Sequence, residues 1–532
     1  MFYLTYKIFS SFSRRERQIL LGIFLTFLVS GFFVSLNAYY SATKEQPALG
    51  GRYLEGVIGQ PTFINPLLAS NSEADADLIE IIYSDLHDLI EKFEVSNDKK
   101  VWTLILKNDL RWSDGKKLTA DDVVFTIEAL QDPDNRSPLA PAWQGAVIEK
   151  INENEVRFTL KAPYAFFADN LKILKIAPKH IFGGIPVANL KLSAYNLEPV
   201  ASGPYKFNHL TTEKDGFISE IFLTTNPYYH QKPPFIPELV FKFYRNEQNL
   251  IRDFNLKKIS GFGGLNPENT TDLQIHHQLV QLYLPRYYAI FLNSSLQPAF
   301  KDKTLRQALD RAINKKKLIK EVFADYAALA EGPIPPTLAG YDKSVYENLN
   351  TPDTPNPQIP NNLELHLVVP DIHFLIKSAK LIKEDWEKLG VKLTTTVLGI
   401  NDINRNIIRN REYPLLIFGN ILKSSPDIYA FWHSSEKFHP GLNLSLYENG
   451  KIDKLLEQVR QELDKEKRQL ALTEIQKIIR DEVPAIFLFN PTYLYVAPPE
   501  LQGFDNAFLA TPAHRFENIA KWHLKTRRTF EN

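Results

Sequence analysis

Cysteine is absent from this chain of 532 residues, and methionine occurs only once. Without cysteine the sequence can form no disulfide bond, no iron–sulfur cluster and no cysteine-based zinc site, and it has no thiol nucleophile. A lipid-modified cysteine is also excluded as a membrane anchor.

An excess of charge of either sign is also absent. The 62 Lys and Arg residues balance 62 Asp and Glu residues, and 23% of the chain is charged. Proteins that hold nucleic acid as their main role usually carry a basic field, so we expect no nucleic-acid partner. A chain of this length exceeds what one compact core usually accommodates, which predicts two or three lobes.

Motifs of known enzyme classes are missing as well. The sequence has neither an H-E-x-x-H helix nor a G-x-S-x-G elbow. The glycine-rich stretch 260–264 lacks the Lys-Ser or Lys-Thr pair of a phosphate-binding loop. The histidine clusters, His276 with His277 and His433 with His439, are weak metal candidates because adjacent side chains diverge. We therefore predict no catalytic residue, no metal and no cofactor.

One long apolar run is present near the N-terminus. Residues 18–43 contain no charge, and residues 19–36 are mostly Ile, Leu, Phe and Val. Because about 20 apolar residues span a bilayer core, this run is just long enough to cross. Lys7, Arg14, Arg15 and Arg17 precede it, which predicts a cytoplasmic N-terminus.

A cleaved signal peptide is the alternative for this run. Signal peptides have apolar regions of about 7–15 residues that end in a small-x-small site. The candidate sites here have Leu36 before Ala38 and Tyr40 before Ala42. These sites are poor, so the sequence favours an uncleaved anchor that contacts the lipid bilayer through residues 19–40.

Residues 110–130 contain the most informative local pattern, LRWSDGKKLTADDVVFTIEAL. Asp114-Gly115 is typical of a tight turn. Thr119 is a predicted N-cap, and Asp122 follows at the capping-box spacing. The apolar residues after it recur at helical spacing. The segment predicts a turn, a cap and an amphipathic helix that packs on a core.

The segment W-S-D-G-K-x-L-T-A-x-D-V-V-F-T within this pattern resembles the signature of the family 5 extracellular solute-binding proteins. These proteins bind oligopeptides, dipeptides or nickel for ABC importers. A second specific match is residues 300–314, where Asn314 stands in place of the family's usual Asp. Weaker matches include residues 176–181, 201–207 and 332–336. The resemblance extends over about residues 50–520.

The resemblance implies an α/β fold with two lobes, of the type II periplasmic-binding-protein class with an extra subdomain in lobe one. The apolar run predicts residues 1–18 as cytoplasmic N-terminus, 19–40 as transmembrane anchor and 41–50 as tether. The resemblance implies residues 51–285 as lobe one, 286–486 as lobe two and 487–532 as the return to lobe one.

Periodicity supports several elements of this fold. It predicts strands at residues 52–59 and 155–160 and a helix at residues 75–89. Residues 363–397 predict a strand, a helix, a glycine cap at Gly390 and a second strand, which is the clearest α/β unit. The proline-containing residues 351–360 predict an extended surface loop. His180 is expected to be a structural hydrogen-bonding residue.

Eight residues stand where the resemblance implies a ligand cleft: Asn71, Tyr83, Ser202, Gly203, Tyr287, Tyr288, Asn420 and Trp432. Arg286, a charge within an aromatic strand, is a candidate for a ligand carboxylate, with a salt bridge at the hinge as the alternative. Peptide binders of the family place an acidic residue in the segment that is 420–425 here, and this chain has none. Asp427 is the candidate substitute.

The sequence thus predicts a monomeric, membrane-anchored, extracytoplasmic binding protein. It would capture a peptide or other small solute by closure of its lobes and pass it to an ABC permease. A peptide-sensing receptor on the same scaffold, without transport, is the first alternative. An extracellular hydrolase is the second.

Overall fold

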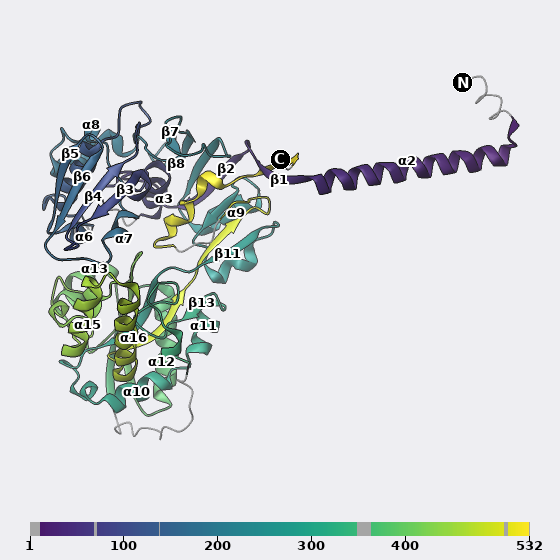
Figure 1. The fold of residues 1–532 in the computed structure, drawn as a ribbon. Coiled ribbons are helices and arrows are strands. Elements are labelled where there is room, and N and C mark those ends of the chain that lie inside the picture. Colours follow the sequence, from purple (N-terminus) through teal and green to yellow (C-terminus); the bar gives the residue numbers. More distant parts are fainter. Residues whose placement is uncertain (1–10, 69–71, 138, 348–362, 505–508, 531–532) are drawn as a thin grey trace.

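The computed structural model describes residues 11–68, 72–137, 139–347, 363–504 and 509–530. The chain forms two α/β lobes and one long N-terminal helix that extends away from them (Figure 1). This helix lies on the side of lobe one, and lobe two is the more distant lobe. The predicted two-lobe α/β fold is confirmed.

Lobe one is built on two sheets. The larger has seven strands in the order β11-β18-β10-β2-β9-β8-β7, and the smaller has the antiparallel order β3-β4-β6-β5. The strands of the larger sheet are β2 (Arg52–Ile58), β7 (Tyr205–Thr212), β8 (Ile218–Thr225), β9 (Glu238–Tyr244), β10 (Gly261–Gly263), β11 (Gln278–Leu282) and β18 (Tyr493–Ala497). Those of the smaller sheet are β3 (Ile90–Val95), β4 (Val101–Leu106), β5 (Ala146–Asn152) and β6 (Glu155–Leu160).

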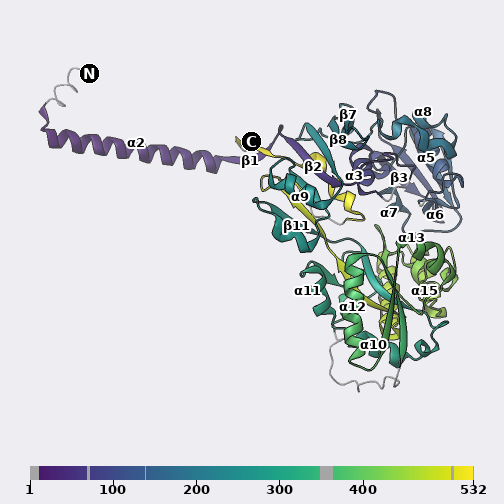
Figure 2. The same cartoon turned by 180° about the vertical axis from the view of Figure 1, so that it is seen from behind.

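The helices of lobe one pack beside these sheets. They are α3 (Glu73–Ile82), α4 (Leu86–Leu89), α5 (Ala120–Gln131), α6 (Ala140–Trp143), α7 (Phe167–Leu171), α8 (Lys179–Phe182) and α9 (Glu247–Asn255), with the 3-10 helix η8 (Pro512–Phe516) near the C-terminus. Helix α7 lies at the edge that faces lobe two, above α13 (Ile400–Asp402) and α15 (Gly450–Gln461) in both views (Figure 1, Figure 2).

Lobe two has one sheet of six strands in the order β13-β17-β12-β16-β14-β15. Its strands are β12 (Arg286–Leu292), β13 (Ala327–Leu329), β14 (Glu364–Pro370), β15 (Lys392–Leu398), β16 (Leu415–Ile421) and β17 (Ala485–Pro491). Its helices are α10 (Lys303–Ala312), α11 (Lys315–Phe323), α12 (His373–Glu387), α13 (Ile400–Asp402), α14 (Tyr429–Trp432), α15 (Gly450–Gln461) and α16 (Lys465–Glu482). The predicted unit is confirmed: β14 and β15 are parallel, α12 joins them, and Gly390 has a φ of 79°.

The chain passes twice between the lobes, after β11 at residues 283–285 and after β17 at Thr492. The expected start of the return, residue 487, lies inside β17, which pairs with β12 and β13 of lobe two. Residues on both faces of β17 are buried, Ile486 and Leu488 in one core cluster and Phe487 in another. This apolar run keeps the strand in lobe two for its whole length.

The tract of residues 110–130 folds as predicted. Thr119 caps α5, and the side chain of Asp122 accepts from the Thr119 backbone N–H, so the capping box is confirmed. Trp112 is fully buried. His180 forms a hydrogen bond with Asp114 at 2.8 Å, which ties α8 to the turn and confirms its structural role. The segment builds a corner of lobe one.

One predicted helix is wrong in its extent. Residues 75–89 form two helices, because Tyr83 has extended backbone angles and ends α3. The carbonyl of Ile82 accepts instead from the backbone N–H groups of Ser202 and Gly203. A long-range pairing therefore replaces the helical bond that the sequence pattern suggested. The predicted loop at residues 351–360 lies outside the described residues.

Helix α2 (Arg14–Ala42) is long and apolar enough to cross a membrane by length and composition. A capping box between Ser13 and Glu16 begins it. The expected tether, residues 41–50, differs in the structure, because the helix continues to Ala42 and the next residues form a strand. Strand β1 (Thr43–Ala48) pairs antiparallel with β19 (Lys525–Phe530). The C-terminal strand supplies the pairing partner that the sequence pattern did not indicate.

Candidate ligand cleft

One edge of the lobe-two sheet faces lobe one. Strands β14 and β16 run parallel and end there, and the antiparallel β12 begins there directly after the first crossing. In open α/β sheets, ligands bind outside the carboxyl ends of the parallel strands, where the following loops leave a crevice. The topology therefore puts the candidate cleft at this edge.

A cavity of about 190 Å³ lies at this edge. Its lining residues are Arg286, Tyr288, Pro370, Ile372, Leu375, Ile400, Phe418, Gly419, Asn420 and Ile421. Of these ten residues Arg286 alone carries a charge, and most of the others are apolar. An apolar pocket with a few convergent polar groups is the usual form of a small-molecule site.

Arg286 presents a cation to this cavity. Its Nη2 donates to the carbonyl oxygen of Pro491 at 3.2 Å. Its Nε is buried and has no hydrogen-bond acceptor among the described residues. A buried donor without an acceptor is costly, so the Nε of Arg286 is a strained point of this wall. A carboxylate suits a guanidinium because both groups are planar and can form two hydrogen bonds.

The two tyrosines after Arg286 point to opposite faces of β12, as successive strand residues must. Tyr288 lines the cavity and packs against Phe374 and Phe489, with ring centroids 5.2 and 5.6 Å away. Tyr287 is fully buried on the other face, and its hydroxyl oxygen accepts from Nδ2 of Asn420 at 2.8 Å. Asn420 thus links the cavity to the core of lobe two.

The lobes touch beside the cleft, at a contact made by Tyr164, Ala165, Asp427 and Arg460. The Tyr164 hydroxyl of lobe one donates to Asp427 of lobe two at 2.8 Å. Arg460 Nε lies 3.0 Å from both oxygens of the same carboxylate, and its backbone carbonyl accepts from the Ala165 N–H at 2.7 Å. Burial and the neighbouring Asp427 raise the pKa of Tyr164. We call this the interlobe contact.

A second link between the lobes is an ion pair. Lys377 on α12 donates to Glu268 of lobe one at 2.8 Å. His373 lies 3.7 Å from the same carboxylate. Lys377 holds the pKa of Glu268 below its usual value. Both partners are partly exposed to solvent, with 36% and 43% of each side chain accessible.

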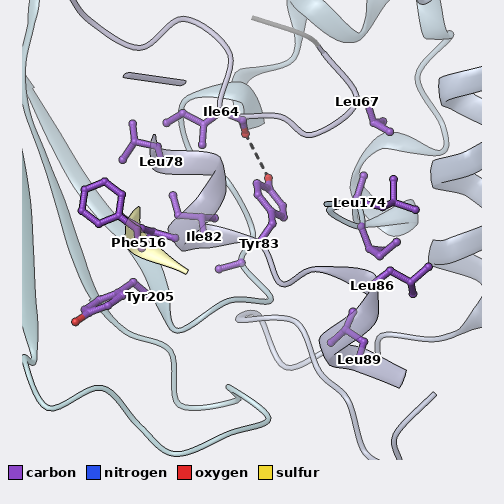
Figure 3. Packing of buried hydrophobic residues seen from close by; sticks show 14 of the residues in the cluster. Ile64, Leu67, Leu78, Ile82, Tyr83, Leu86, Leu89, Leu174, Tyr205 and Phe516 are labelled. Carbon is purple, nitrogen blue, oxygen red and sulfur yellow. Dashed lines mark hydrogen bonds between the residues drawn. The ribbon is translucent and has the colours of Figure 1, made fainter. Parts of the chain in front are cut away.

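The other predicted cleft residues lie within the lobes. Tyr83 is buried in the core of lobe one, and its hydroxyl donates to the carbonyl of Ile64 at 3.3 Å (Figure 3). Ser202 Oγ accepts from the Ser84 N–H at 3.0 Å. A Cβ atom on Gly203 would lie 2.5 Å from the Ile81 carbonyl oxygen.

Trp432 packs in the core of lobe two with its ring 5.9 Å from Phe487. Asn71 lies outside the described residues. The structure thus brings Arg286, Tyr288 and Asn420 to one cavity, with Tyr287 behind it and Asp427 at the interlobe contact.

Lobe one contains a buried ionic cluster away from this cavity. Arg515 on η8 contacts Glu55 at 2.9 Å and Asp77 at 2.6 Å, and all three side chains are at most 2% exposed. Burial raises the pKa of Glu55 to about 7 and that of Asp77 to about 6. The two carboxylates share one guanidinium, so burial favours a bound proton on one of them, with Glu55 the stronger proton acceptor. It joins β2, α3 and the C-terminal segment.

The structure adds residues to the candidate cleft that the sequence did not indicate. Tyr164 and Arg460 approach Asp427 across 263 and 33 residues of sequence, respectively. No local sequence pattern predicts such pairs. The one signal in the sequence was the aromatic segment after β6, residues 163–167, which contains Tyr164. Among the described residues, no group of three or more His, Cys, Asp or Glu side chains is arranged to hold a metal ion.

Comparison with known proteins connects this geometry to a family. Residues 86–439 match the model of bacterial extracellular solute-binding proteins, family 5 middle. The oligopeptide-binding protein AppA of Bacillus subtilis is 25% identical over 95% of this chain and 97% of its own length. The dipeptide-binding protein of Escherichia coli is 23% identical over 87% of this chain and 93% of its own length.

Solved structures share the fold. The structure of AppA from Bacillus subtilis in complex with a nonapeptide has a TM-score of 0.70 and 24% identity, and the match covers 90% of this chain and 100% of AppA. The ABC transporter substrate-binding protein CtaP of Listeria monocytogenes has a TM-score of 0.77 and 24% identity over 89% of this chain and 99% of its own. With more than half of its residues matched by the family model, this chain belongs to family 5 of the bacterial extracellular solute-binding proteins.

Proposed function

We propose that this protein captures a peptide-like solute in the cleft between its lobes and passes it to an ABC permease in the same membrane. The observation that carries this proposal is the apolar cavity of lobe two, at the end of its sheet that faces lobe one, with Arg286 as its one cation. An apolar wall suits side chains of varied shape, and the guanidinium suits the carboxylate of a peptide C-terminus. Similarity to the oligopeptide- and dipeptide-binding proteins agrees with this choice.

Closure of the lobes around the solute is the second part of the proposal. The interlobe contact and the ion pair between Lys377 and Glu268 join the lobes only when they are close together. The two crossings, at residues 283–285 and Thr492, lie side by side and are the natural hinge. A few residues between rigid lobes suffice for such a motion.

The third part is the location of the protein. We propose that α2 stays uncleaved as a single membrane span and that both lobes stand outside the cytoplasm, each molecule acting as a monomer. The basic residues before the apolar run support this orientation. A peptide-sensing receptor on the same scaffold is the alternative. The same anchor favours it, since a receptor can act while it stays attached to the membrane. Uptake of labelled peptide that is lost on deletion of the gene would support transport, and unchanged uptake would support sensing.

The solute is identified by native mass spectrometry of the protein purified from its own host. A peptide found in this way is then compared with its C-terminal amide by calorimetry. We expect the free acid to bind at least tenfold more tightly, and Arg286→Gln to remove this difference. Arg480→Gln is the matched control, because Arg480 precedes β17 at the opposite edge of the sheet. Equal binding of acid and amide to the unaltered protein would refute the role of Arg286.

A further inference from the structure

The end of helix α2 is clamped by the C-terminal strand. We call the pair of strands β1 and β19 the clasp. Six residue pairs join them, from Thr43 with Phe530 next to the helix to Ala48 with Lys525 next to lobe one. The C-terminal strand therefore reaches back along the chain to the exact point where the apolar helix ends. A flexible tether would need no such partner.

Arg528 ties the clasp to the helix. Its Nη2 donates to the carbonyl oxygens of Tyr40 at 3.0 Å and Thr43 at 2.8 Å, and its Nε donates to Thr43 Oγ1 at 3.0 Å. The guanidinium also lies 4.5 Å from the centroid of the Tyr40 ring. A cation at a helix C-terminus is favoured by the helix dipole and by the carbonyls that lack partners. These contacts hold helix and strands in one unit.

Aromatic side chains surround this junction and remain exposed. Tyr39 is 42% exposed, Tyr40 51% and Phe530 66%. Tyr39 and Phe530 meet edge to face, with ring centroids 6.1 Å apart. Exposed rings at the end of a membrane span are typical of the headgroup zone, where an apolar ring and a polar tip are both satisfied.

The side chains of the clasp separate by face. Paired residues point to the same side of a ribbon, so Lys44, Arg527 and Lys525 share one face with Thr529, Gln46 and Ala48. The other face has the ion pair of Arg528 with Glu45 at 3.3 Å. One face of the clasp is therefore basic, without a carboxylate among its six residues.

The length of the helix fixes the depth of the junction. Residues 19–36 would span about 27 Å at 1.5 Å per residue, close to the ~30 Å of a hydrocarbon core. Residues 37–42 add about 9 Å, slightly more than the roughly 5–8 Å of one headgroup layer. Tyr39 and Tyr40 then lie among the headgroups, and the first pairs of the clasp lie at their outer boundary. Phe530, in the first of these pairs, extends its ring to Tyr39 and so reaches the same layer.

We propose that the helix-proximal end of the clasp is a phospholipid-binding surface. Tyr39, Tyr40 and Phe530 insert among the headgroups, and the basic face meets lipid phosphates at its Lys44 end. Because the clasp is continuous with both α2 and lobe one, this contact holds the binding lobes at a fixed height above the membrane. The inference rests on the retained membrane span of the proposed function.

The absence of cysteine makes a direct test possible with the full-length chain. Phe530→Cys and Thr526→Cys place a fluorophore on the same face of β19, four residues apart, which corresponds to about 13 Å along a strand. Each labelled protein is reconstituted into vesicles of phosphatidylcholine and phosphatidylglycerol that contain a headgroup spin label. Flotation of the vesicles reports membrane anchoring, and quenching of the fluorophore reports its depth.

We expect both proteins to float and the label at position 530 to be quenched at least threefold more than the label at 526. Adding Arg528→Gln should reduce quenching at 530 to the level at 526, while flotation is retained. Equal quenching at both positions in floating vesicles would overturn the docking and leave the anchor intact. Protein that fails to float would overturn the anchor and the docking together. Undiminished quenching in the Arg528→Gln variant would overturn the clasp as the positioning element.

Discussion

Removal of the Tyr164 hydroxyl is the sharpest test of lobe closure. The hydroxyl donates to Asp427 across the lobes at 2.8 Å. Tyr164→Phe keeps the ring and deletes this one hydrogen bond. Asp427 keeps Arg460 as a partner within lobe two, at 3.0 Å, so no carboxylate is left unpaired. When the lobes separate as proposed, both groups would be released to water, and the substitution should cost nothing in that state.

The expected magnitude follows from the type of hydrogen bond. A bond to a charged partner contributes about 1.5–3 kcal/mol, and the lower value suits a contact at the edge of a cleft. The closed state alone loses this energy, so closure becomes less favourable by about 1.5 kcal/mol. Since 1.4 kcal/mol corresponds to a tenfold change in an equilibrium constant, the Kd for the captured solute should rise about tenfold.

Calorimetry with the solute that co-purifies with the protein measures this change. The matched control is Tyr429→Phe, because the Tyr429 hydroxyl contacts Ser435 within lobe two and its ring lies 3.9 Å from the Arg460 guanidinium. The control should leave Kd within about twofold of the original. The melting temperature without solute should be the same for both variants. An unchanged Kd for Tyr164→Phe would refute the reasoning that this contact stabilises the closed state.

Three further predictions address other parts of the chain. Lys377→Ala removes the partly exposed ion pair with Glu268 and should change Kd by no more than about fivefold in calorimetry, since such pairs contribute about 0–1 kcal/mol; a tenfold change would contradict this. Burial raises the pKa of Glu55 from 4.5 to about 7, so the folded state holds a proton that the unfolded chain releases between these values. The free energy of unfolding should therefore fall as pH rises through this window, and Glu55→Gln should flatten the decline of the melting temperature; an unaltered slope would argue against a proton shared near Arg515. Thr119→Ala removes the cap of α5 and should cost about 1 kcal/mol, seen as faster amide exchange in that helix; unaltered exchange would remove the cap as a stabilising element.

Local patterns of the sequence determined much of the scaffold. The cap at Thr119 and the unit from β14 to β15 follow from hydrogen-bonding side chains and apolar periodicity within a few residues. The apolar helix α2 follows from composition alone. The family signature added the two-lobe arrangement. The cap, the β14–β15 unit and α2 depend on residues that are close together in the sequence, so the sequence alone predicts them.

Tertiary structure decided the rest, because the deciding partners are distant in sequence. Tyr83 interrupts a helical pattern since the Ile82 carbonyl accepts from Ser202 and Gly203. The sequence identified Arg286 and Asn420 as cleft candidates, but only the fold joins them at one cavity and assigns Asp427 to Tyr164 and Arg460. Likewise, the residues after the apolar helix form a strand only because the C-terminal strand returns to pair with them. Residues 43–48 have no sequence pattern that predicts a strand, and the strand that pairs with them lies almost 500 residues away.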